Sequence, residues 1–70
     1  MDSKQMIIAC CANMRNPLEH AQNRLKQAFE AIAKIEAEGT SFDERLALIR
    51  QLENHFGTIQ ADMERAKMAI

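Results

Sequence analysis

Apolar residues recur at alternating steps of three and four along most of this 70-residue chain, and this periodicity limits the possible folds more than any other feature. In the first half the series consists of Ile7, Cys11, Met14, Leu18, Ala21, Leu25, Ala28, Ile32 and Ile35. In the second half it consists of Phe42, Ile49, Leu52, Phe56, Ile59, Met63, Ala66 and Ile70. An average spacing of 3.5 residues over several heptads predicts α-helices that pack as in coiled coils. We therefore expect an all-α fold.

A short segment around Gly39 separates the two series. Glycine suits the left-handed position just past a helix end, and Ser41 with Glu44 three residues later forms a capping box for a second helix. These signals predict one helix over about residues 3–38 and another over about residues 42–69. A link this short makes the two helices antiparallel neighbours, so we expect an antiparallel helical hairpin.

Folding the chain at this turn predicts which residues lie at the same level of the hairpin. The numbers of the residues in each predicted pair sum to 80 or 81. Several pairs set a small residue against a large one, as interdigitating cores do. The pairs are Ile35 with Leu46, Ile32 with Ile49, Ala28 with Leu52, Leu25 with Phe56, Ala21 with Ile59, Leu18 with Met63, Met14 with Ala66 and Cys11 with Ile70.

Two residues disturb the regular pattern. Pro17 lies inside the first helix, where it removes a backbone donor and crowds the carbonyl four residues before it. Asn16, Pro17 and Glu19 also resemble a fresh helix start, so we expect a kink or short break near Asn13–Asn16. Gly57 lies on the polar side of the second helix and weakens it, but the unbroken heptad phase favours a continuous helix there.

The length predicts one domain over residues 1–70, and one that is short for an unaided fold. Domains of this size seldom gain more than about 3–5 kcal/mol from one core, and disulfides, metals or oligomerisation usually add to it. Cys10 and Cys11 are adjacent, and consecutive cysteines cannot join distant segments. Free thiols favour a reducing compartment, so we expect a cytoplasmic protein that oligomerises.

The apolar stripe is wider than a two-helix contact needs, because Ile8, Phe29, Leu46 and Leu48 flank it. This breadth favours a dimer of hairpins that forms a four-helix bundle. Parallel and antiparallel docking of the two hairpins both remain open. The predicted interface consists of Met6, Ile7, Ile8, Cys11, Met14, Phe29, Leu46, Leu48, Phe56, Ile59, Met63 and Ile70.

The first helix is predicted to extend beyond the second. Ile70 lies level with residues 10 and 11, so Met6–Ala9, the most apolar run of the chain, forms an overhang. Asp2 and Gln5 resemble a helix cap, which indicates a helix here rather than a disordered tail. An apolar overhang needs a cover, either from a second copy or from a different protein.

No constellation of catalytic or metal-binding residues is visible, so we expect no enzyme, no cofactor and no metal. His20 and His55 are the only imidazoles, and they lie too far apart along the hairpin to share an ion. Cys11 occupies a core position, whereas Cys10 lies at the edge and is the more accessible thiol. The carboxylates Glu36, Glu38, Asp43 and Glu44 cluster at the turn, either as a solvated loop or as a docking tip for a cation or partner.

The charge balance argues against polyanions and membrane surfaces as partners. The formal net charge is −1, bases and acids are interspersed, and Trp and Tyr are absent. Ile7-Ile8-Ala9-Cys10 matches the pattern before a lipidated bacterial cysteine, but a basic leader and a sufficient apolar stretch are missing. No run approaches the length of a transmembrane span.

Three functions fit this architecture. The first is a non-enzymatic adaptor, regulator or assembly factor that acts as a homodimeric bundle. The second is a co-chaperone or subunit whose apolar face another protein completes. The third is an RNA- or DNA-binding regulator, because the hairpin is similar in architecture to a small plasmid RNA-binding regulator built from two hairpins.

Overall fold

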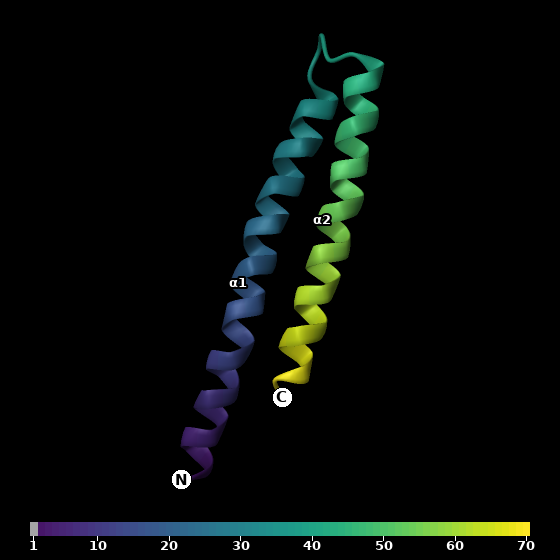
Figure 1. Ribbon diagram of the computed structural model, residues 1–70. Coiled ribbons are helices and arrows are strands. Elements are labelled where there is room, and N and C mark those ends of the chain that lie inside the picture. The colour runs from purple at the N-terminus through teal and green to yellow at the C-terminus, as the bar shows by residue number, and fades with distance from the viewer. Residues whose placement is uncertain (1) are drawn as a thin grey trace.

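The computed structural model describes residues 2–70, which form two long antiparallel helices (Figure 1). Helix α1 spans Ser3–Glu36 and helix α2 spans Phe42–Met68. The hairpin measures 59 × 16 × 10 Å, so each helix has only the other beside it and one broad face remains on either side. The prediction of an all-α helical hairpin is confirmed.

The ends of the helices carry the capping residues that the sequence indicates. The Asp2 carboxylate accepts a hydrogen bond from the backbone N–H of Gln5 at 2.8 Å, which satisfies one of the free donors of the first turn. The Ser41 hydroxyl accepts from the N–H of Glu44 at 3.2 Å in the same way. Gly39 adopts a φ of +85° between the helices, a conformation that costs glycine little and other residues more.

Helix α1 continues through Pro17, so of the predicted kink or short break near Asn13–Asn16 the break is wrong. Pro17 lacks an N–H and removes one helical hydrogen bond, but the turns before and after it keep theirs, and a long packed helix tolerates this loss. Gly57 lies inside an uninterrupted α2, as the heptad phase predicts.

Cross-helix hydrogen bonds confirm the predicted level of each residue along the hairpin. His20 contacts Asp62, Arg24 contacts His55, and the Arg45 side chain reaches the Ile35 carbonyl. The residue numbers of these pairs sum to 82, 79 and 80, close to the predicted 80 or 81. The axial register of the hairpin is therefore the one that folding at Gly39–Thr40 predicts.

The rotation of the helices about their axes differs from the prediction. The buried residues between the helices are four alanines and one aspartate, namely Ala21, Ala28, Ala31, Ala66 and Asp62. Leu25 with Phe56 and Leu18 with Met63 stay exposed in the hairpin, so the prediction that these pairs face each other across it is wrong. The predicted pairs Ala28 with Leu52, Ala21 with Ile59 and Met14 with Ala66 each set a buried residue against a half-buried one. The exposed large residues of both helices lie instead on one side of the contact line, in which the fully buried residues are mostly alanines.

Candidate interaction surface

The contact line between α1 and α2, here called the seam, contains one buried carboxylate. Asp62 has no exposed surface, and the Nδ1 of His20 lies 2.5 Å from its Oδ2 oxygen. Arg65, one turn further along α2, donates to its other oxygen. A buried charge is costly unless it is paired, and here both oxygens have a cationic or hydrogen-bonding partner. His20 and Arg65 are themselves largely exposed, so this cluster opens onto one side of the hairpin.

Two further polar contacts cross the seam. The Arg24 guanidinium donates to the Nδ1 of His55 at 3.4 Å. Near the turn, Arg45 donates to the carbonyls of Ile35 at 2.9 Å and Ala37 at 3.2 Å, where the end of α1 leaves carbonyls without helical partners. The fully buried apolar residues of the seam are thus all alanines, and hydrogen bonds join the two helices at three positions along the hairpin.

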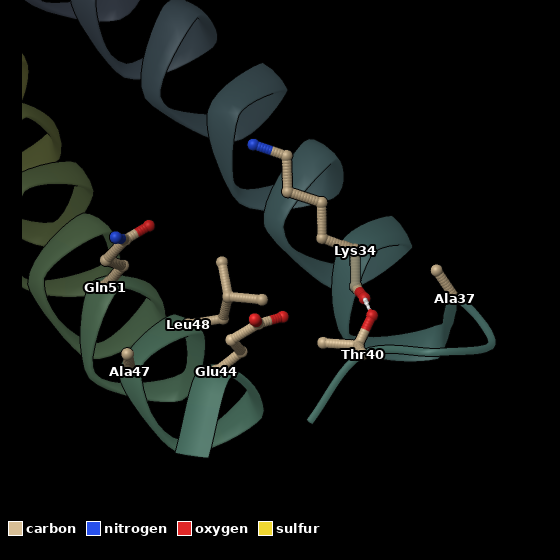
Figure 2. Close-up of a pocket in the computed structure, with 7 residues that line it drawn as sticks. All are labelled: Lys34, Ala37, Thr40, Glu44, Ala47, Leu48 and Gln51. Carbon is tan, nitrogen blue, oxygen red and sulfur yellow. Dashed lines mark hydrogen bonds between the residues drawn. The ribbon is translucent and has the colours of Figure 1, made fainter. Parts of the chain in front are cut away.

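The side of the seam that carries His20 and Arg65 is here called the polar face, and it is hollowed in three places. A hollow of about 390 Å³ near the turn lies between Lys34 and Thr40 on one side and Glu44 and Leu48 on the other (Figure 2). A second hollow of about 250 Å³ shares Lys34 and Leu48 with it and extends to His55. The third, of about 400 Å³, is lined by Asn13, Asn16, Pro17, His20 and Arg65.

The opposite side of the seam, here called the apolar face, carries large side chains from both helices. On α1, Leu18, Leu25 and Phe29 follow one another at helical spacing, and the corresponding stripe on α2 begins at Phe42. The exposed fractions of these large residues range from 40% for Leu46 to 86% for Ile70. The apolar face consists of Ile7, Ile8, Cys11, Leu18, Leu25, Phe29, Phe42, Leu46, Ile49, Phe56, Met63 and Ile70.

Nearly all the residues of the predicted interface lie on this face or at its edges. Met14 and Ile59 are half-buried at its boundary with the seam. Two residues are exceptions: Leu48 lies in the seam and borders the hollows of the polar face, and Met6 lies two heptads before His20, on the polar side of α1. The structure adds Leu18, Leu25, Phe42 and Ile49 to the surface; the sequence series contained them, but as residues that fill the space between the two helices.

Asp62 is the residue that sequence reasoning missed. Its signal was present, since Asp62 lies one heptad after His55 and two after Leu48, and all three occupy the seam. His20 and His55, to which the sequence assigned no contact, both make contacts across the seam. No three residues of the metal-binding types cluster among residues 2–70.

The free end of the hairpin combines apolar side chains with both thiols. Met6, Ile7, Cys10, Cys11, Met14 and Ile70 line an apolar hollow of about 420 Å³. Cys10 is half-buried and Cys11 is exposed, the reverse of the expected order, because the seam lies on the Cys10 side of the stripe. Both thiols are free.

Comparison of the chain with protein-family models, curated proteins and solved structures finds no match. Within residues 2–70, neither helix contains a segment both long enough and apolar enough to cross a membrane.

Proposed function

We propose that this protein is a small non-enzymatic interaction protein that works as a homodimer, in which the apolar faces of two hairpins close on each other as a four-helix bundle. The observation that carries this proposal is the one-sided distribution of large apolar residues. Contiguous exposed apolar surface of this length is unusual on a monomer and marks an interaction site.

The shape of the face favours a second copy as its occupant. Both stripes point to the same side, so the complement is a flat two-helix surface, and a second hairpin has the same length and width. A face about 59 Å long and 16 Å wide has room for the ~800 Å² per partner of a standard interface. The net charge of −1 imposes little repulsion between copies.

The polar face differs from the apolar face in its chemistry, and this difference also favours the apolar face as the dimer interface. It carries the His20–Asp62–Arg65 cluster and the Arg24–His55 contact, and Asn13 and Asn16 lie beside His20 and Arg65 in one of its hollows. Burial of this side would remove water from exposed cationic groups, which is costly. The two sides of one hairpin therefore divide into a surface to be covered and a surface to remain in solvent.

The test is the solution mass from light scattering over a hundredfold range of protein concentration. We expect a dimer near 16 kDa, twice the 8.0 kDa of the chain. Leu25→Asp places a charge in the centre of the apolar face and should give a mass of 8.0 kDa, whereas Gln27→Asp, two residues away on the polar face, should leave the dimer intact.

A wild-type monomer at all concentrations contradicts the proposal. Equal loss of the dimer in both variants contradicts the assignment of the interface to the apolar face. If the wild type is monomeric and acquires a cooperative unfolding transition only with a different protein, the alternative of a heterologous subunit replaces the homodimer.

A further inference from the structure

The first residues of α1 have no helix beside them in the hairpin. Ile70 lines a hollow with Cys10 and Cys11, so residues 3–9 extend beyond the end of α2. Seven helical residues correspond to about 10 Å. Figure 1 shows this extension of α1 past the C-terminus. Met6, Ile7 and Ile8 in this overhang are each more than half exposed, so a dimer that left the overhang uncovered would keep a strongly apolar end in water.

The two ends of the hairpin differ in side-chain charge. Residues 34–46 at the turn carry four carboxylates and two bases. Residues 2–15 and 62–70 at the free end carry four bases and three carboxylates. The side-chain charge is therefore −2 at the turn and +1 at the free end.

We propose that two copies dock with their turns at opposite ends, so that the overhang of each copy lies beside the turn of the other. This inference rests on the proposed homodimer and specifies its geometry. A two-fold axis across the bundle, level with residues 21 and 22 of α1, sets α1 antiparallel to the partner's α1 and α2 antiparallel to the partner's α2.

This docking covers the overhang. Residues 3–9 then lie level with the partner's residues 34–40, close to the start of the partner's α2. Phe42, at that position of each chain, is 72% exposed, and Leu46 one turn later belongs to the same apolar face. With both turns at the same end, α1 would lie against the partner's α2, which ends at Met68 and leaves the overhang without a helix beside it.

The apolar residues of the facing helices then match in symmetric pairs. Between the two α1 helices, residues whose numbers sum to 43 lie level, and between the two α2 helices the sum is 119. These sums place Leu18 with the partner's Leu25, Cys11 with the partner's Ile32, Phe56 with the partner's Met63, and Ile49 with the partner's Ile70.

Charge selects the same orientation. With turns at opposite ends, the acidic turn of one copy lies level with Lys4 of the other, and the two acidic turns lie at opposite ends of the bundle. With turns together, eight carboxylates gather at one end of the bundle. Separation of like charges of this kind fixes the orientation of a complex more than it adds to affinity.

The orientation can be measured as a distance between nitroxide labels by pulsed electron paramagnetic resonance. In a Cys10→Ala/Cys11→Ala background, Lys4→Cys carries a label at the free end and Glu38→Cys carries one at the turn. From the helical rise, opposite docking gives about 50 Å between the two labels in either homodimer. Docking with turns together gives about 20 Å, since neighbouring helices of a bundle lie 8–10 Å apart.

A mixture of the two labelled chains supplies the reciprocal measurement. If the turns lie at opposite ends, the label on a Lys4→Cys chain and the label on a Glu38→Cys chain are about 20 Å apart. If the turns lie together, these two labels are about 50 Å apart. A dimer with short distances in the separate samples overturns the orientation and leaves the homodimer standing. A mass of 8.0 kDa with no dipolar signal overturns the homodimer itself, and with it this inference.

Discussion

The seam and the apolar face lie side by side along the same two helices, yet they use different chemistry. The seam buries four alanines, half-buries larger residues such as Leu52 and Ile59, and is crossed by directional bonds to Asp62, His55 and backbone carbonyls. The apolar face carries the leucine, isoleucine and phenylalanine side chains that would form a core, and it leaves them largely exposed.

This difference separates two roles. Hydrogen bonds and close alanine packing specify one register, but small side chains bury little apolar area, so the seam stabilises the hairpin only modestly. The large side chains can contribute most of the hydrophobic free energy only when another surface covers them. The hairpin therefore sets the alignment of the two helices, and the proposed dimer would supply the greater part of the stability.

The largest effect is expected from truncation of a large side chain on the apolar face. Phe56→Ala should lower the free energy of unfolding by about 3–5 kcal/mol per chain, as removal of a buried aromatic ring does. Urea unfolding at two protein concentrations measures both this loss and the dependence on concentration that a dimer requires. Asn54→Ala, at an exposed position of the same helix, should change the value by less than about 0.5 kcal/mol. A small effect of Phe56→Ala would show that the apolar face stays in water and would break the comparison.

The next effect tests the close approach of the helices at the seam. Ala28→Leu should destabilise the protein by about 1–3 kcal/mol, because the added atoms have no space between α1 and α2. Ala33→Leu makes the same chemical change at an exposed position of α1 and should be nearly neutral. Thermal unfolding followed by circular dichroism compares the two variants. Equal stability would mean that the seam is looser than its alanines indicate.

A smaller effect is expected from the polar cluster of the seam. His20→Ala leaves Asp62 with Arg65 as its remaining side-chain partner and should cost about 1–2 kcal/mol, a value limited by the exposure of His20. His55→Ala removes only the long 3.4 Å contact with Arg24 and should cost less. Chemical denaturation of both variants gives the comparison. A larger loss of stability in His55→Ala than in His20→Ala would show that the buried Asp62 carboxylate does not need His20 as a partner.

Substitution of the two glycines should give the smallest changes in stability. Both glycines lie outside the seam and the apolar face, so these changes provide a reference for the other variants. Gly39→Ala forces a side chain into a φ of +85° and should cost about 1 kcal/mol, although space is available there. Gly57→Ala should gain about 1 kcal/mol, because a Cβ at this position meets no atom within 4 Å and alanine favours the helix. Opposite shifts in the unfolding midpoint are expected, and a loss at Gly57 would indicate that this side of α2 is also covered.

The sequence by itself determined the two helices, the turn, the caps and the axial register of the hairpin. Each of these depends on local chemistry or on the length of the link, as the bonds at Asp2 and Ser41 and the conformation of Gly39 show. The uninterrupted helix through Pro17 was not foreseen, because a local rule for one residue competes with the cooperative packing of a 34-residue helix.

Only the tertiary structure decided how the helices rotate about their own axes. Heptad spacing tells which residues share a stripe, but not whether that stripe points to the nearest helix or beside it. The choice depends on how closely two backbones can approach and on which polar groups find partners between them. Ala21, Ala28 and Ala66 permit the approach, and the bonds of His20 and Arg65 to Asp62 satisfy the buried carboxylate. That rotation places large residues of the predicted hairpin core, such as Leu25 and Phe56, on an exposed face.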